Sequence, residues 1–334
     1  MAPLPSPGAA TKGIPAPATD ALHPWFLRDV LEGLARPRKE IPSRWLYDAR
    51  GSRLFQEIMA LDAYYPTRVE HEILERHAGE IAARMGGGAC TVVDLGAGDG
   101  SKTRLVLAAL LRRGLRSTYA PVDLSQAALS AAARRMAAEL PGLRVAPVRS
   151  DYLGGLRALG PRSAGPMLVL FLGSNVGNLE HGDADAFLRD LRRSLRPGDH
   201  LLVGFDLLKD LAILRAAYDD QDGVTAAFNL NLLSRVNREL DGDLDPGAFA
   251  HVATFDPTRP AMESWLESRR RQVVRVAGRS FRLDAGERIH TEISCKYRER
   301  DVGAFARFAG FEEVERFRDR RRWFVDALWR VGAA

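Results

Sequence analysis

Cysteine is scarce in this sequence, with only Cys90 and Cys295 among 334 residues. Both fall in strand-like segments far apart along the chain, so we expect neither a disulfide framework nor a thiolate metal site. The seven histidines show no metal-ligand spacing with cysteine or acid, and we expect no bound metal. This cysteine usage favours a reducing, cytoplasmic setting.

Long apolar runs are also missing. No stretch of about 18 or more apolar residues occurs, so no membrane span is expected. The opening stretch "MAPLPSPGAATKGIPAPATD" lacks the charged and apolar regions of a secretory signal. Its many Pro and Ala residues, with few large apolar groups, predict a disordered tail over residues 1–20.

Lysine is rare, and arginine carries most of the positive charge. The net charge is +5, and basic clusters occur at residues 269–271 and 316–322. Such clusters can bind nucleic acid, but 43 acidic residues are interleaved along the chain. We therefore interpret the arginines as solvated surface and expect no nucleic-acid partner.

From residue 90 the sequence alternates apolar strands with helices rich in Ala, Leu and Arg. We expect strands at 91–95, 118–124, 143–150, 167–173 and 200–207, and helices at about 101–113, 125–139 and 183–195. This alternation predicts an α/β fold with a doubly wound parallel sheet. The C-terminal stretch predicts a helix and then two strands that complete the sheet at its edge.

The segments on either side of this alternating region differ from it. Helices are expected at 23–34, up to about Met59, and again from about Thr67, where Thr67 and Glu70 have the spacing of a capping box. Residues 208–296 interrupt the alternation and indicate a second region.

The stretch "VVDLGAGDGSKT" runs from a strand into a glycine loop that three classes of nucleotide enzyme share. The distance of Lys102 from the glycines excludes a P-loop. Asp94 and Asp99 would repel the pyrophosphate of a dinucleotide. S-adenosylmethionine has no phosphate and carries an ammonium and a sulfonium, so the loop favours this methyl donor.

Acids at the ends of the next strands support the same cofactor. Asp123 ends the following strand, where a carboxylate accepts both ribose hydroxyls of an adenosine. Asp151 and Tyr152 end the third and suit the adenine amino group and ring face. Asn178, in "FLGSNVGNL" after the fourth strand, suits a left-handed turn, but it also lies where the methyl acceptor must bind. Both interpretations of Asn178 remain open at this stage.

Several longer motifs resemble the ergothioneine-pathway histidine Nα-methyltransferases. They span nearly everything from about Ile41 onward: "WLYDARGSRLF", "YYPTR", "FLGSNVGNL", "AYDDQDGVTAAFNLNLLSRVNREL", "GAFAHVATFD" and "TEISCKY". The resemblance implies that S-adenosylmethionine trimethylates the α-amino group of L-histidine to the betaine hercynine. It also implies two domains. One is a Rossmann-like class I methyltransferase domain (69–207 and 297–334), and the other is a smaller α+β substrate-binding domain (21–68 and 208–296).

The resemblance assigns substrate-binding roles. It implies an aromatic pair, a grip on the amino and carboxylate end, and a pair holding the imidazole, carried here by Tyr47 and Tyr64, by Asn178 and Tyr218, and by Glu292 and Ser294. We expect Tyr47 to orient the amine and Asn178 to hold the other polar groups, which makes these two the catalytic candidates.

The cofactor residues come from the loop acids, the glycines and the resemblance together: Asp94, Gly96, Gly98, Lys102, Asp123, Asp151, Tyr152 and Gly173. Two positions depart from the family pattern. Tyr152 replaces a phenylalanine, and Ser264 replaces a methionine that packs against the substrate side chain. The smaller Ser264 can enlarge the pocket or admit a water, so another aromatic amino acid such as tryptophan is the alternative substrate.

Two other function classes remain open. A methyltransferase acting on protein or nucleic acid would use the arginine clusters, and its binding would depend steeply on salt. A binding module that keeps the fold would not turn over S-adenosylmethionine. We expect instead a monomeric enzyme whose substrate is a free amino acid, a small molecule.

Overall fold

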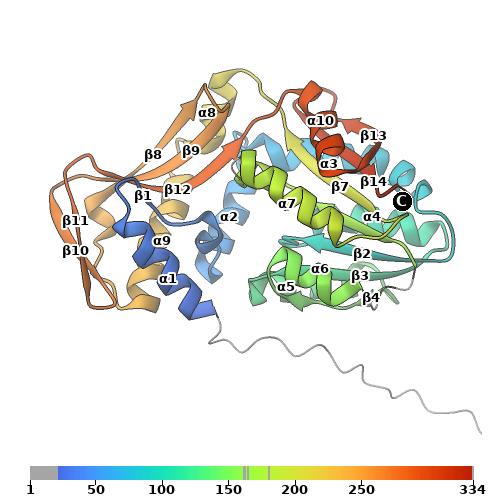
Figure 1. The fold of residues 1–334 in the computed structure, drawn as a ribbon, viewed down its shortest axis with the longest axis horizontal. Coiled ribbons are helices and arrows are strands. Elements are labelled where there is room, and N and C mark those ends of the chain that lie inside the picture. The colour runs from blue at the N-terminus through green and yellow to red at the C-terminus, as the bar shows by residue number, and fades with distance from the viewer. Residues whose placement is uncertain (1–21, 161–162, 164, 180, 333–334) are drawn as a thin grey trace, which may run out of the picture.

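The apolar strand segments within residues 89–206 and 312–330 form one large sheet, at the right of the computed structural model in Figure 1. The structure describes residues 22–160, 163, 165–179 and 181–332. A smaller sheet and a β-hairpin lie at the left of the same view. The tail predicted over residues 1–20 lies outside the described residues.

The large sheet has eight strands in the order β13-β14-β7-β6-β2-β3-β4, with β5 also paired to β3. Its strands are β2 (Ala89–Leu95), β3 (Arg116–Asp123), β4 (Arg144–Val145), β5 (Val148–Arg149), β6 (Met167–Phe171), β7 (His200–Asp206), β13 (Glu312–Arg318) and β14 (Phe324–Arg330). Pairing is parallel from β7 to β4, whereas β14 and β13 add antiparallel strands. The central strands are buried along their length, as their unbroken apolar sequences require.

Helices cover both faces of this sheet. One face packs against α3 (Tyr65–Ala83), α4 (Ser101–Arg112) and α5 (Gln126–Glu139). The opposite face packs against α6 (Tyr152–Leu159), α7 (His181–Arg193) and α10 (Glu299–Ala309). The predicted doubly wound Rossmann-like sheet, with a helix and two strands completing its edge, is confirmed.

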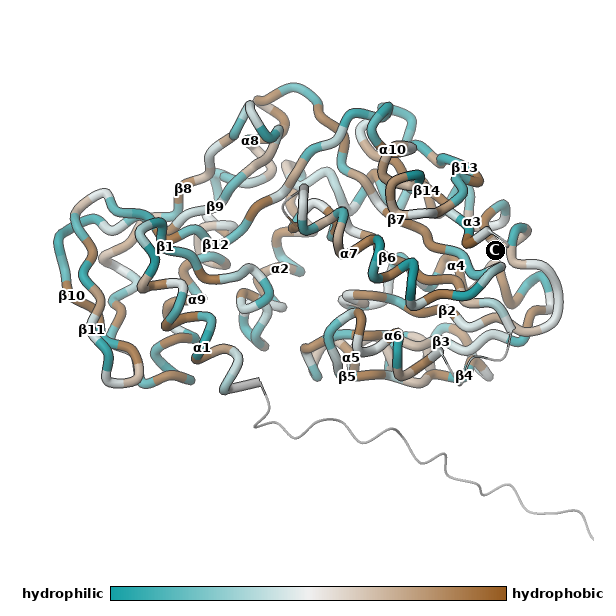
Figure 2. Tube along the Cα trace, in the orientation of Figure 1, coloured by the Kyte–Doolittle hydropathy of each residue, from teal (hydrophilic) through white to brown (hydrophobic). Residues whose placement is uncertain are grey.

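The smaller sheet has the order β1-β12-β9-β8. It joins a strand near the N-terminus to three strands that follow β7 along the chain. Its strands and the hairpin are β1 (Lys39–Glu40), β8 (Phe249–Asp256), β9 (Ala261–Ser268), β12 (Arg288–Cys295), β10 (Gln272–Val276) and β11 (Arg279–Leu283). The helical elements of this part are α1 (Leu22–Ala35), η2 (Ser43–Leu46), α2 (Ala49–Ala60), α8 (Leu211–Tyr218), α9 (Val224–Leu240) and η5 (Pro246–Ala248). The brown stretches of α1 and α9 in Figure 2 mark the apolar residues that these helices contribute to a separate core with Trp45, Phe249 and Phe281.

The predicted division between residues 68 and 69 falls inside α3. This helix packs on the large sheet from its first residue, Tyr65, so the natural boundary is a few residues earlier. The two-domain division itself stays a prediction.

Two local predictions were wrong. The helix expected from Thr67 begins at Tyr65, with Pro66 in its first turn, so Thr67 and Glu70 form no capping box. The strand expected over 143–150 is split into two short pieces around Pro147. Proline has no N–H to donate, so it cannot continue the ladder with β3.

Candidate active site

The loop after β2 contains three glycines in a backbone conformation that other residues rarely adopt. Gly96, Gly98 and Gly100 have φ angles of 77°, 53° and 74°, in the left-handed region that glycine enters without steric cost. A Cβ on Gly96 would lie only 2.9 Å from Asn175 Nδ2 and 3.1 Å from the Tyr152 hydroxyl. A Cβ on Gly98 would meet no atom within 4 Å, so the chain leaves space beside this residue. The predicted contact of Gly96 and Gly98 with the cofactor stays a prediction.

Asp94 ties the first strand to the helix that follows the loop. One of its carboxylate oxygens accepts hydrogen bonds from the hydroxyls of Thr103, at 2.6 Å, and Tyr119, at 3.0 Å. Burial raises the pKa of Asp94 to about 6. These contacts show an anchoring role, and the predicted contact with the cofactor stays a prediction.

Asp123 ends β3 at the same edge of the sheet. Its Oδ1 accepts the backbone N–H of Ser125 at 2.8 Å. Burial raises the pKa of Asp123 to about 6. A half-buried carboxylate at this point suits a pair of hydroxyl donors such as those of a ribose.

Asp151 and Tyr152 begin α6. The Asp151 carboxylate caps this helix by accepting the Gly154 N–H at 2.6 Å. The Tyr152 ring packs edge-on against Phe171, with ring centroids 5.4 Å apart, and burial raises the pKa of its hydroxyl. A cap and a packed ring account for both residues locally, so their predicted adenine contacts stay predictions.

Gly173 follows β6 and is held by a buried carboxylate that the sequence analysis missed. Glu70 Oε1 accepts the Gly173 N–H at 2.7 Å, and Glu70 Oε2 is paired with Lys102. Asp326 lies in the same cluster, where burial and the charge of Glu70 raise its pKa well above the ordinary value. Lys102, expected to contact the cofactor, is thus paired with Glu70 behind the loop.

A pocket lies between this loop and the smaller sheet, with about 560 Å³ of empty space that includes its opening to solvent. Its lining comes from segments far apart in the sequence: Tyr47, Phe55, Ile58, Tyr64, Pro66, Gly173, Ser174, Asn175, Asn178, Asp206, Ala217, Tyr218, Thr225, Phe228, Glu292 and Ser294. Six of the seven predicted substrate residues are in this set. Aromatic rings and polar side chains line the pocket together, as expected for a site that holds a small polar molecule.

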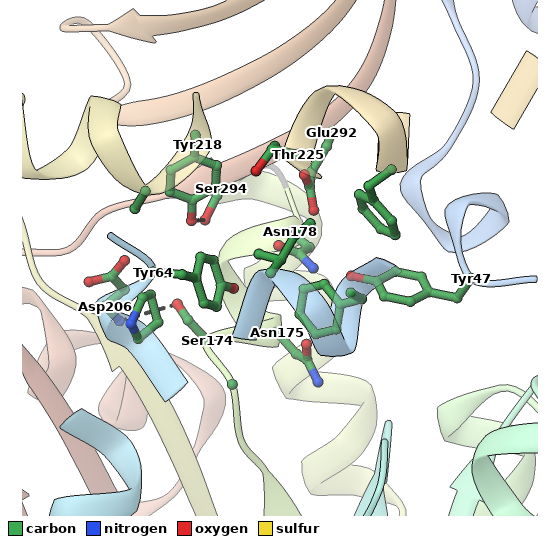
Figure 3. Close-up of a pocket in the computed structure, with 16 residues that line it drawn as sticks. Tyr47, Tyr64, Ser174, Asn175, Asn178, Asp206, Tyr218, Thr225, Glu292 and Ser294 are labelled. Carbon is green, nitrogen blue, oxygen red and sulfur yellow. Dashed lines mark hydrogen bonds between the residues drawn. The ribbon is translucent and has the colours of Figure 1, made fainter. Parts of the chain in front are cut away.

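Figure 3 shows Tyr47 and Tyr64 with their hydroxyl ends turned toward the space beside Asn178, and Glu292 pointing in from β12. The Tyr47 ring is fixed edge-on by Phe55 and Phe228, with centroid distances of 5.3 and 5.4 Å. Burial raises the pKa of both tyrosines well above its ordinary value, so both hydroxyls stay protonated at neutral pH.

Asn178 is the last residue of η4 (Asn175–Asn178). Its φ is not positive, and the left-handed residue of this segment is Ser174, with φ 56°. The interpretation of Asn178 as a left-handed turn residue is therefore wrong. A Cβ on Gly177 would lie 2.9 Å from the Cys295 carbonyl oxygen, so a glycine there lets η4 approach β12 and places Asn178 in the pocket.

Ser264 is the predicted substrate residue that does not line the pocket. It is buried on β9, directly opposite Glu292 in the β9–β12 pairing. Burial raises the pKa of Glu292 to about 7, opposed by the charge of Lys296 and the Ser264 hydroxyl. Ser264 is thus a neighbour of Glu292 in the sheet, and its predicted substrate contact stays a prediction.

A second buried cluster that the sequence analysis missed surrounds Asp206 at the end of β7. Tyr65 donates to both carboxylate oxygens of Asp206, at 2.9 and 2.7 Å. Lys209 pairs with one oxygen, and Lys296 Nζ lies 2.9 Å from the other. The scarcity of lysine was the available signal, because two of the five lysines in the chain form ion pairs with Asp206.

The remaining features concern the other function classes. The arginines of the basic clusters largely face acids: Arg270 pairs with Asp245, Arg316 with Glu313, and both Arg318 and Arg322 with Glu299. Within the described ranges, no helix combines the length and apolarity needed to cross a bilayer. Nor does that part of the chain bring three or more His, Cys, Asp or Glu side chains into a metal-binding group.

The doubly wound sheet, its glycine loop and the acid ending the next strand together define a Rossmann-like methyltransferase that uses S-adenosylmethionine. The family model described as "Histidine-specific methyltransferase, SAM-dependent" matches residues 26–331. The chain belongs to this family.

Curated relatives agree with this assignment. The chain is similar to the histidine N-alpha-methyltransferase of Mycobacterium tuberculosis, with 43% identity over 309 residues that cover 92% of this chain and 93% of the relative. It is 30% identical to the ergothioneine biosynthesis protein 1 of Neurospora crassa, over 86% of this chain and 33% of that protein. It is also 28% identical to an L-tryptophan methyltransferase of Psilocybe serbica, over 84% and 86% of the two chains.

Proposed function

We propose that this enzyme transfers three methyl groups to the α-nitrogen of L-histidine and releases the betaine hercynine. The observation that supports this most is the pairing of Glu292 and Ser294 on one face of β12 inside the pocket. A carboxylate acceptor beside a hydroxyl donor matches the two nitrogens of an imidazole. The 43% identity to a histidine N-alpha-methyltransferase supports the same substrate.

S-adenosylmethionine supplies an electrophilic methyl group when it is bound. The glycine loop, Asp123 and the loop held by Glu70 would bind it, because they meet at one edge of the sheet beside the pocket. The chain's own contribution to the reaction is then mainly positioning, since an amine lone pair must be aligned with that methyl group.

Tyr47 and Asn178 orient the substrate in this proposal. The Tyr47 hydroxyl stays protonated because burial raises its pKa, so it holds the amine by hydrogen bonding and does not act as a strong base. The α-amino group, with a reference pKa near 7.7–8.0, loses its proton to solvent before each transfer. As methyl groups accumulate, aromatic rings that line the pocket attract the quaternary ammonium by about 0.5–2 kcal/mol where it meets a ring face.

The test is product analysis with all twenty amino acids and S-adenosylmethionine in one mixture. Mass spectrometry is expected to show Nα-trimethylhistidine as the main product, with mono- and dimethyl forms early. A main product methylated on the ring, or one that stops at a single methyl group, would contradict the proposal.

Tryptophan or another aromatic amino acid is the second candidate, because Ser264 is smaller than the methionine of the family pattern. The same mixture decides this point, since trimethyltryptophan would then exceed trimethylhistidine. We also propose that the enzyme is a cytoplasmic monomer without a nucleic-acid or membrane partner. Cys90 and Cys295 are buried and form no disulfide, which suits a reducing compartment.

A further inference from the structure

Lys296 lies behind the pocket wall and donates its three hydrogen bonds to three different side chains. Its Nζ lies 2.9 Å from Asp206 Oδ2, 2.7 Å from the Tyr218 hydroxyl and 2.7 Å from Ser294 Oγ. The side chain is fully buried and lies over the Tyr218 ring, 4.6 Å from its centroid. An ammonium has three N–H groups and no acceptor, so the direction of all three bonds is fixed.

The two hydroxyls that receive these bonds also contact each other. Tyr218 and Ser294 have their oxygens 2.7 Å apart, and one hydrogen occupies the space between them (Figure 3). Each oxygen already accepts a hydrogen from Lys296. The pair has two hydroxyl hydrogens, so one of them is left to point at whatever enters the pocket.

We propose that Lys296 is a positioning residue that makes the Tyr218–Ser294 pair a hydrogen-bond donor toward the substrate ring. This inference rests on the proposed use of histidine. Glu292 lies two residues from Ser294 on the same strand face and supplies the matching acceptor. The pocket therefore presents one acceptor and one donor, the complement of a neutral imidazole with one N–H and one bare nitrogen.

Without Lys296, the Tyr218–Ser294 pair is no longer fixed as a hydrogen-bond donor toward the ligand. Each hydroxyl then has a free lone pair and can accept as readily as it donates, so the pocket no longer requires a ring acceptor. A buried polar site discriminates because a ligand that leaves its groups unpaired is penalised, and this penalty depends on the fixed direction of the donor.

Lys209 offers a matched control. It also pairs with Asp206 and lies over a tyrosine ring, that of Tyr65, at 4.2 Å. Its hydrogen bonds go to Asp206, Tyr65 and the Leu207 carbonyl, and none of those described reaches Tyr218 or Ser294. Lys209→Met and Lys296→Met therefore remove equal charge from the same carboxylate, and only Lys296→Met alters the donor.

The experiment compares the dissociation constants of histidine and β-(2-thienyl)alanine by calorimetry with S-adenosylhomocysteine present. Thienylalanine has a five-membered ring without the two nitrogens. Lys296→Met is expected to weaken histidine on the order of tenfold or more and thienylalanine less than about threefold. Lys209→Met is expected to leave the ratio of the two constants within about twofold. Equal losses for both ligands in Lys296→Met, or the same change of ratio in Lys209→Met, would overturn the inference.

A second pair of variants serves if Lys296→Met does not fold. Tyr218→Phe leaves the bond from Lys296 to Ser294 in place, so the Ser294 hydrogen still points at the ligand. The preference for histidine over thienylalanine is therefore expected to be maintained. Ser294→Ala removes that donor and lowers the preference for histidine over thienylalanine about tenfold. A Tyr218→Phe variant that lowers the preference for histidine over thienylalanine as much as Ser294→Ala does would refute the assignment of Ser294 as the donor. A wild-type enzyme that does not prefer histidine to thienylalanine would instead refute the proposed function.

Discussion

Glu70 on α3 accepts the backbone N–H of Gly173 at 2.7 Å, so a buried carboxylate holds the loop that follows β6. The other oxygen of Glu70 pairs with Lys102 on α4. One acid thereby fixes the loop and the cofactor-side helix relative to each other.

Glu70→Ala is expected to lower the free energy of unfolding by about 3–5 kcal/mol, because it leaves the buried ammonium of Lys102 and the Gly173 N–H without their partner. Urea denaturation measures this change. Glu75→Ala, on the exposed side of the same helix, is the control and is expected to change stability by less than about 0.5 kcal/mol. Similar losses in both variants would mean that the Glu70 cluster has no special role.

Asp123 predicts a cofactor affinity that depends on pH. Its pKa of about 6 means that the carboxylate, which accepts hydroxyl hydrogens, is lost as pH falls through 6. Binding of S-adenosylhomocysteine is expected to weaken between pH 7 and pH 5, and Asp123→Asn is expected to bind at least about tenfold more weakly at pH 7.5, from loss of bonds worth about 1.5–3 kcal/mol each. Calorimetry across this pH range tests both, and an Asp123→Asn protein that binds like wild type would exclude the ribose assignment.

Glu292 predicts opposite effects on stability and on function. Burial raises its pKa from 4.5 to about 7, so the folded protein binds a proton that the unfolded chain has lost over this range. The contribution of Glu292 to the free energy of unfolding is therefore expected to fall as pH rises from 4.5 to 7 and then to level off. Glu292→Gln is expected to be more stable than wild type at pH 8, and this advantage is expected to vanish near pH 4.5 in thermal unfolding.

The Glu292→Gln substitution is also expected to weaken the use of histidine as a substrate. Loss of one hydrogen bond to a charged group costs about 1.5 kcal/mol or more, so kcat/KM for histidine falls at least about tenfold at pH 8. The affinity for S-adenosylhomocysteine is expected to remain within about threefold. A variant with unchanged histidine kinetics would place the imidazole elsewhere in the pocket.

Asn178→Ala is expected to reduce kcat more than cofactor binding. Asn178 lines the pocket and is brought there by the close contact of Gly177 with β12, so it acts on the acceptor and its alignment. We expect a loss of at least about tenfold in kcat, because a small misplacement of the amine is costly. Single-turnover kinetics at saturating histidine measure it, and a loss confined to cofactor affinity would contradict the assignment.

Much of the fold could be predicted because its signals are local, whereas the six pocket residues came from the resemblance of the longer motifs to a known family. Apolar strands alternate with helices, and Glu292 and Ser294 stand two apart in a strand, which puts them on one face. The buried ion pairs could not be predicted this way. Tyr65 and Asp206 are 141 residues apart, and a single acid at a strand end does not reveal which lysine will meet it. Ser264 shows the same limit, since only the pairing of β9 with β12 places it behind Glu292.

The order of strands in the two sheets also governs when the protein can fold during synthesis. β12 lies between β1 and β9, so the N-terminal segment has no strand partner until residue 295 has been made. The large sheet likewise waits for β14, which ends at Arg330 and pairs with β7. Neither core is therefore complete until its last strand has been made, and a nascent chain stalled before residue 288 exposes apolar surface in both. We expect such chains to depend on chaperones far more than the finished enzyme does.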